Sequence, residues 1–208
     1  VESYPSGTDF DQPDIRNTQE VWLELIDGAR SEILWQTFYV VHEEGEATGP
    51  ILQALKKAAR RGVKIQLLVD PKFVKTYPET LDELAALDNI EVRHSPVGEW
   101  LGGVMHAKMM LVDGHSGFLG SQNFDWRSLD HIRELGVVFH DPGLRVPEHE
   151  IALPVVGVGS QLSESRKNAL HDKRTVIFEH LVQSVNVHYL AGAHSAKKGR
   201  AHRILPLS

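Results

Sequence analysis

The sequence predicts an α/β sandwich, with a mixed or mostly parallel sheet that carries helices on both faces. Between residues 18 and 140, apolar runs rich in Val, Ile and Leu alternate with stretches whose apolar residues recur at helical spacing. Gly, Pro and Asp-Gly pairs separate these stretches and interrupt regular structure. An alternation of strands and helices is typical of sheets that are covered by helices.

The first part of this region supplies two helices and two strands. Residues 1–17 are loop-like, and Thr18 is a suitable N-cap for a first helix. The apolar run 32–41 predicts a buried strand. Pro50 opens a second helix, and the run 63–69 predicts a second strand. We therefore expect two successive strand–helix units.

The second part contains a third helix followed by shorter strands. We expect these elements at residues 79–87 (helix), 90–93 (strand), 107–112 and 117–120 (a strand pair) and 135–139 (strand). The Asp113-Gly114 pair predicts the tight turn that joins the strand pair. We expect the strand of this pair that carries His106 to be central in the sheet, because strand–helix units flank it.

The chain divides into two parts by pattern. Residues 1–142 hold the strand–helix alternation, whereas residues 143–208 contain several Gly and Pro residues, one plausible helix and a basic tail. We expect the second part to be a C-terminal appendage. The full chain of 208 residues is long enough to bury a core without disulfides.

Composition excludes several kinds of site. The chain has no Cys, so thiolate nucleophiles and Cys-based metal sites are absent. The formal net charge of -6 does not give the overall basic character of a duplex-binding protein. No apolar run approaches the ~18 residues of a membrane helix, so we expect no transmembrane segment.

One constellation of polar residues points to phosphate chemistry. On a strand, His106 and Lys108 would project to the same face, and the returning strand would bring Ser121 and Asn123 back beside them. An ammonium and neutral donors suit the oxygens of a phosphodiester. A neutral imidazole can attack phosphorus, and Glu134 is the candidate carboxylate that would hold its other nitrogen.

The aromatic residues near this constellation can be interpreted in two ways. Trp100, Phe124 and Trp126 could stack on the bases of a single-stranded nucleic acid. Packing in the core or at the rim of the site is an equally good explanation for each of them.

The spacing His106-x-Lys108-x4-Asp113-x6-Gly120-Ser121-x-Asn123 resembles the HKD motif of the phospholipase D superfamily. The resemblance extends over about residues 1–142 and is strongest to the branch of lysosomal phospholipase D-like 5′ exonucleases. Its other matching segments are Val1–Phe10, Val21–Leu23, Phe38–Tyr39, Arg61–Val63, Asp125–Leu129 and Glu134–Val138.

The resemblance implies a phospholipase D-like fold and a phosphodiesterase that acts on phospholipid or single-stranded nucleic acid. His106 would be the nucleophile or the paired acid, passing through a phosphohistidine. Lys108, Ser121 and Asn123 would bind phosphate, and Glu134 would orient the histidine. Asp113 and Gly120 would be structural. Among the aromatic residues near the motif, Trp126 is the one that we predict to contact substrate. The resemblance also implies no metal and no other cofactor, and an exported, periplasmic or lumenal location.

The family's site combines two such motifs, in which one histidine attacks and the other protonates the leaving oxygen. This chain has one full motif, and the weak echo at His171-Asp-Lys173 has the wrong spacing. Two explanations stay open: a homodimer that pairs two copies of the motif, or the first half of a two-motif enzyme. A further alternative is an orphan half-site that binds phosphate or a partner and turns over poorly.

Overall fold

The structure is a computed structural model that describes residues 1–95, 97–98 and 103–141. These residues belong to one compact unit, Val1–Ile151. The predicted appendage at 143–208, Trp100 and the echo at His171 lie outside the described residues. The division of the chain at residue 142 therefore stays a prediction.

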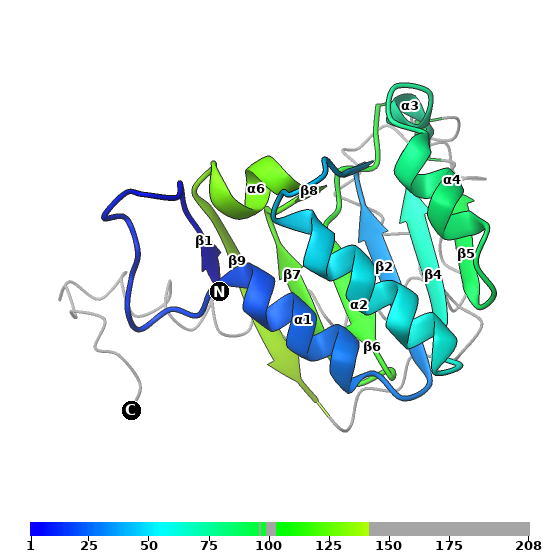
Figure 1. The fold of residues 1–208 in the computed structure, drawn as a ribbon, viewed down its shortest axis with the longest axis horizontal. Helices are drawn as coiled ribbons and strands as arrows, with labels where there is room; N and C mark the ends of the chain where they lie inside the picture. Colours follow the sequence, from blue (N-terminus) through cyan, green and yellow to red (C-terminus); the bar gives the residue numbers. More distant parts are fainter. Residues whose placement is uncertain (96, 99–102, 142–208) are drawn as a thin grey trace, which may run out of the picture. The chain divides into compact units, whose positions relative to one another are not determined.

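A mixed seven-stranded sheet forms the centre of the unit, in the order β1-β9-β7-β6-β2-β4-β5 (Figure 1). Its strands are β1 (Glu2–Ser3), β2 (Glu32–Thr37), β4 (Lys64–Val69), β5 (Ile90–His94), β6 (Met109–Val112), β7 (Ser116–Gly120) and β9 (Glu134–His140). Strands β2, β4 and β5 are parallel, and the remaining pairs are antiparallel. The predicted α/β class and mixed sheet are confirmed, and β6 lies in the middle of the sheet as expected.

Helices alternate with strands in the first part of the chain, as predicted. They are α1 (Thr18–Gly28), α2 (Thr48–Arg60), α3 (Pro71–Val74), α4 (Glu79–Ala85) and α6 (Trp126–Asp130), and a two-stranded sheet pairs β3 (Val40–Val41) with β8 (Phe124–Asp125). Asn17 rather than Thr18 is the N-cap of α1, because its side chain accepts the amide of Gln19 at 2.8 Å.

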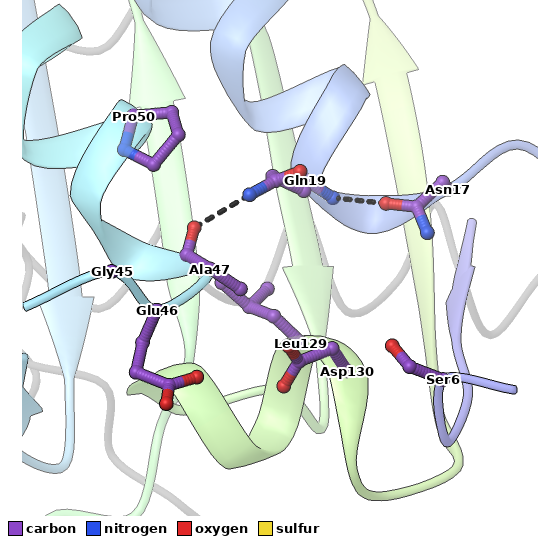
Figure 2. A pocket seen from close by; sticks show the side chains of 9 residues that line it. All are labelled: Ser6, Asn17, Gln19, Gly45, Glu46, Ala47, Pro50, Leu129 and Asp130. Atoms are coloured by element: carbon purple, nitrogen blue, oxygen red, sulfur yellow. Dashed lines mark hydrogen bonds between the residues drawn. The ribbon is translucent and has the colours of Figure 1, made fainter. Parts of the chain in front are cut away.

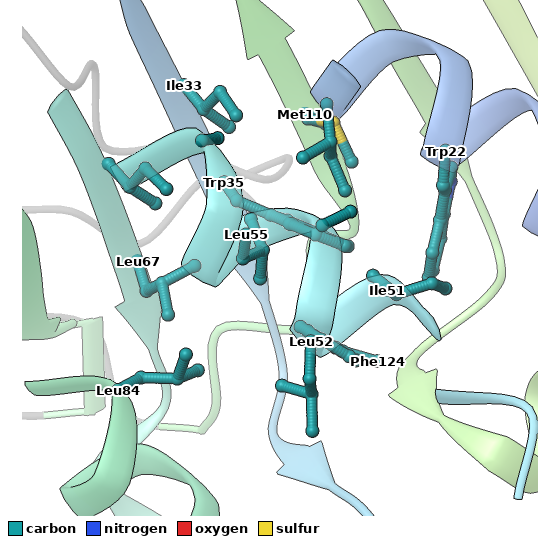
Figure 3. Packing of buried hydrophobic residues seen from close by; sticks show 14 of the residues in the cluster. Trp22, Ile33, Trp35, Ile51, Leu52, Leu55, Leu67, Leu84, Met110 and Phe124 are labelled. Carbon is teal, nitrogen blue, oxygen red and sulfur yellow. The ribbon is translucent and has the colours of Figure 1, made fainter. Parts of the chain in front are cut away.

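The main core lies between one face of the sheet and the three longer helices, α1, α2 and α4 (Figure 3). Trp35 of β2 stacks on Phe124 with ring centroids 4.6 Å apart, and Trp22 of α1 meets both rings edge-on. All three side chains are at most 1% exposed. The other face carries Leu34, Leu68 and Leu111, which are also buried.

The shortest strand is held by a partner at the far end of the sequence. In β1, Glu2 pairs with Leu135 and Ser3 pairs with Glu134 of β9. The Ser3 hydroxyl also donates to the carbonyl of Ser128 at 2.6 Å. The N-terminal segment, predicted to be loop-like, thus contributes a strand because β9 offers it unpaired backbone groups.

Candidate active site

The predicted site residues gather at one end of the sheet. There β2, β4 and β7 finish, and β6 and β9 begin, because β6 and β9 run opposite to their neighbours. His106 and Lys108 precede β6, Ser121 and Asn123 follow β7, and Glu134 opens β9. Side chains from three separate segments therefore share this end of the sheet.

The segment that carries the histidine is anchored on both sides. The buried carboxylate of Asp70 accepts the amide of Met105 at 2.5 Å and, with its other oxygen, the amide of Lys72 at 2.9 Å. On the other side, the carbonyl of Lys108 accepts the amide of Gly120 at 3.1 Å. These bonds fix the backbone around His106. Strand β6 begins only at Met109, so it was wrong to place His106 and Lys108 on the strand itself.

Lys108 and His106 contact each other directly. The Lys108 Nζ lies 2.9 Å from His106 Nδ1 and donates to the His106 carbonyl at 2.8 Å. Lys108 is only 4% exposed, whereas His106 is exposed. The pair presents a reachable imidazole backed by a buried ammonium.

Burial sets the protonation of both groups. Desolvation, and then the neighbouring Lys108 charge, lower the pKa of His106, and Glu134 opposes this shift. Desolvation also lowers the pKa of Lys108 to about 8, again against the charge of Glu134. At neutral pH the histidine is therefore neutral and the lysine is predominantly charged, which suits a nucleophile and an anion-binding group.

Glu134 acts on the pair through its charge. It raises the pKa of both His106 and Lys108, which places the three groups in one electrostatic cluster. Among the described residues, the hydrogen bond to the imidazole comes from Lys108. Glu134 as the direct partner of the ring stays a prediction for the substrate-bound state.

Ser121 and Asn123 differ in how their side chains are used. The Ser121 hydroxyl is bonded to the backbone of Leu135, accepting its amide at 3.1 Å and donating to its carbonyl at 3.2 Å. The Asn123 Oδ1 is buried without a hydrogen-bond partner in the described part of the chain. The Ser121 hydroxyl is thus already engaged, whereas Asn123 has an unpaired acceptor, which a hydrogen-bond donor and not a phosphate oxygen would satisfy.

The remaining motif residues lie apart from this cluster. Asp113 stands at the opposite end of β6, where its carboxylate accepts the amides of Arg30, Ser31 and Glu32 at 2.8–3.2 Å. Burial would raise the pKa of Asp113, but these hydrogen bonds outweigh it and lower the pKa. Asp113 thus joins β6 to the start of β2, and its contacts support the predicted structural role.

Gly120 leaves no room for a side chain. A Cβ atom there would meet Gln122 Oε1 and Phe118 Cζ, each at 2.4 Å. This crowding supports the predicted structural role of the glycine next to Ser121.

The two interpretations of the nearby aromatic residues can be compared for Phe124 and Trp126. Phe124 is fully buried on Trp35, so for this residue packing in the core is the correct interpretation. Trp126 is partly buried, 4.8 Å from the ring of His131, and its role in substrate binding stays a prediction. Trp100 cannot be assessed.

The aromatic ring that does contact His106 was missed by sequence analysis. The centroid of the Phe38 ring lies 4.7 Å from that of the His106 ring, and the Lys108 Nζ lies 5.6 Å from the Phe38 centroid. The signal was available, because Phe38 and Tyr39 directly follow a buried strand that ends at the site. Asp70 was also missed, although it directly follows β4, another strand that ends at the site.

A separate pocket of about 420 Å³ lies where α1, the loop before α2 and α6 meet (Figure 2). Gln19 crosses its wall to donate to the carbonyl of Ala47 at 2.6 Å, beside the Asn17 cap. Glu46 and Asp130 also line it, and no predicted catalytic residue does. This pocket is therefore a gap between packed elements and not part of the candidate active site.

A family model described as "Cardiolipin synthase, PLD-like domain" matches residues 22–151. The chain belongs to the phospholipase D (PLD)-like family. Phospholipase D Z of Dictyostelium discoideum is 34% identical over 146 residues, covering 65% of this chain and 34% of that protein. The 5'-3' exonuclease PLD3 of Bos taurus is 34% identical over 157 residues, covering 68% of this chain and 31% of that protein. The chain thus spans about a third of the length of these curated relatives.

A solved structure supports the fold assignment. NucT from Helicobacter pylori superposes with a TM-score of 0.50 and 23% sequence identity, covering 59% of this chain and 76% of that chain. At this identity the likeness concerns the fold alone. The predicted phospholipase D-like architecture is confirmed by the family match and by this neighbour.

Two further observations concern the described ranges only. No group of three or more His, Asp or Glu side chains in them could hold a metal ion. No helix there is long and apolar enough to cross a membrane. A reaction that needs no metal stays a prediction.

Proposed function

We propose that this chain is one half of a phosphodiesterase site, with His106 as the nucleophile. The observation that carries the proposal is the contact of the buried Lys108 ammonium with an exposed, neutral imidazole, both within the field of Glu134. Family membership supports it. The substrate is a phosphodiester of a phospholipid or a single-stranded nucleic acid.

The reaction follows from the chemistry of these groups. An unprotonated ring nitrogen of His106 forms a bond to phosphorus, while the bond from phosphorus to the leaving oxygen breaks. A phosphate oxygen takes the place of Nδ1 as an acceptor for the Lys108 ammonium, and the Asn123 amide supplies a further donor. Glu134 accepts a hydrogen bond from the N–H of the second ring nitrogen and so stabilises the cationic phosphohistidine. Water then attacks phosphorus and gives its proton to a general base, and the bond from phosphorus to the His106 nitrogen breaks.

The leaving alkoxide needs a proton that this cluster does not supply. Lys108 must stay charged to bind phosphate, and Glu134 is assigned to the imidazole. A positioned general acid contributes roughly a hundred- to ten-thousand-fold in rate. We propose that a second histidine motif provides it, either from another copy of the chain across a twofold axis or from a second half of a longer protein.

The test is a trapping experiment with matched variants. Wild type should form an acid-labile, base-stable phosphoprotein with bis(p-nitrophenyl) phosphate, and His106→Asn should form none. His115→Asn is the control, because His115 lies at the opposite end of the sheet beside Ser116. Turnover by His106→Asn would refute the assignment of the nucleophile.

The oligomeric state tests the source of the acid. Size-exclusion chromatography with the same assay should show activity in a dimer, and heterodimers with His106→Asn should turn over weakly at most. Full activity from a strictly monomeric preparation would refute a shared site. An inactive monomer that binds inorganic phosphate would instead identify the chain as an orphan half-site.

A further inference from the structure

A chain of ring contacts leads outward from the nucleophile. Phe38 meets His106 at 4.7 Å and Phe73 of α3 at 4.7 Å. Tyr39 lies 5.5 Å from Phe73 and 6.2 Å from Tyr77. We call the four residues Phe38, Tyr39, Phe73 and Tyr77 the aromatic shelf. It begins in contact with His106 and continues to the segment after α3.

The side chains of the shelf keep part of their surface in solvent. All four side chains are partly exposed, in contrast to the buried Trp35 and Phe124. Their mutual interplanar angles are between 40° and 76°, whereas Trp35 and Phe124 are stacked at 10°. No shelf ring is therefore stacked in parallel on another aromatic ring among the described residues.

The shelf is held in place before any ligand arrives. The Tyr39 hydroxyl donates to Asp125 at 3.1 Å, and Arg127 pairs with the same carboxylate at 2.7 Å. Burial, and then the charge of Asp125, raise the pKa of Tyr39 to about 12, so its hydroxyl stays protonated. Asp70 caps α3, which carries Phe73, and also holds Met105 beside the nucleophile. Such preorganisation lowers the entropic cost of binding.

The charge around the shelf suits a polyanion. Lys72 and Lys75 are exposed and flank Phe73 in the sequence. The nearby carboxylate of Asp125 is neutralised by Arg127, and that of Asp70 is buried and hydrogen-bonded. Aromatic faces interleaved with cations are the usual platform for single-stranded nucleic acid, because every base has a face that can stack.

The same residue types also occur where proteins insert into membranes, but the exposure differs. Rings that enter a bilayer must protrude, and no shelf ring is among the highly exposed large apolar side chains of the described residues. We propose that the aromatic shelf binds nucleobases of a single strand whose scissile phosphate lies at His106. This inference rests on the proposed function and specifies its substrate class.

The test separates base stacking from phosphate binding. His106→Asn protein is titrated by fluorescence anisotropy, at fixed salt, with a labelled oligothymidine and with an abasic oligomer of equal length. The oligothymidine should bind roughly 5- to 150-fold more tightly for each base stacked on the shelf. Adding Phe73→Leu should remove most of that preference and leave binding of the abasic oligomer unchanged.

Two further variants control for misfolding and for general loss of aromatic surface. Tyr77→Leu, at the outer end of the shelf, should reduce the base preference independently of Phe73. Phe10→Leu should not reduce the base preference. Phe10 is 49% exposed on the N-terminal segment, which lies beside β1 at the opposite edge of the sheet from α3 (Figure 1). Equal loss of binding to both oligomers in Phe73→Leu would overturn the inference.

The possible outcomes distinguish this inference from the proposed function. Turnover without any base preference leaves the proposed function standing and refutes the shelf. A base preference without turnover by wild type supports base binding by the shelf and refutes the proposed function. If Phe73→Leu weakens binding to phosphatidylglycerol vesicles and leaves oligothymidine binding intact, the shelf is a membrane contact and the inference is wrong.

Discussion

Replacing Lys108 with methionine should destroy phosphate binding and yet stabilise the fold. The Lys108 side chain is 4% exposed, and burial lowers its pKa to about 8. At neutral pH the folded protein therefore carries an ammonium that its surroundings disfavour. Methionine fills a similar volume without a charge to desolvate.

The size of the gain follows from the pKa. A fall from 10.5 to about 8 corresponds to about 3.4 kcal/mol at 1.36 kcal/mol per unit, which is an upper limit. Solvent at the open site screens part of this penalty. Loss of the two hydrogen bonds to His106 reduces the gain in stability by ~1 kcal/mol. We expect a net gain of about 1 kcal/mol, or about 3 °C in Tm.

The pH dependence has a definite sign. Between about pH 8 and the unfolded-state pKa near 10.5, the unfolded chain binds more protons at Lys108 than the folded protein does. Stability of the wild type should therefore rise with pH in this window. The advantage of Lys108→Met should be complete below pH 8 and should shrink above it.

The assay is urea unfolding followed by circular dichroism between pH 7 and pH 10, with Lys57→Met as the control. Lys57 is exposed on α2, and its replacement should change the free energy of unfolding by about 0.5 kcal/mol at most. A loss of more than 1 kcal/mol in Lys108→Met at pH 7 would show that the ammonium stabilises the fold, contrary to this reasoning.

Three other predictions concern activity and architecture. If Lys108 binds phosphate as a cation, kcat/KM should fall above about pH 8, and in an active Lys108→Arg variant this limb should disappear from the pH–rate profile. Asp113→Ala should cost about 3 kcal/mol at pH 7 in urea melts, because it leaves the amides of Arg30, Ser31 and Glu32 unpaired. The penalty should shrink as pH falls through the lowered pKa of Asp113, leaving the cost of Ala at a positive φ, and a penalty that does not change with pH would contradict this account. Asp70→Asn, which cannot accept both of its amides without changing its partners, should lower kcat/KM about tenfold while the protein stays folded by circular dichroism.

Local pattern was sufficient for the strands of four residues or more, the longer helices and the hairpin that follows His106. The Asp113-Gly114 turn is the clearest case, since both residues have positive φ, which Gly adopts freely and Asp adopts more readily than most residues. The fixed spacing of His106 and Lys108 likewise predicted their proximity. These features depend on short-range geometry, which the sequence states directly.

Features that depend on long-range packing could not be obtained in this way. Phe124 and Phe38 are both aromatic residues near a motif or a strand end, yet one is in the core and the other touches the nucleophile. Which ring is buried depends on where α1 and α2 settle on the sheet. The pairing of Glu2 with Leu135 is equally invisible, because a two-residue strand has no periodicity to detect.

That two-residue strand has a practical consequence for anyone who trims this protein for expression. A boundary chosen from sequence would discard residues 1–17 as a loop and start at α1. It would also remove the backbone that pairs with Glu134 and Leu135, the first residues of β9. The shortened protein would keep every residue of the motif, and would still lose the support beneath the carboxylate assigned to orient His106. An inactive product of that kind would report on the chosen start site and not on the chemistry of the proposed site.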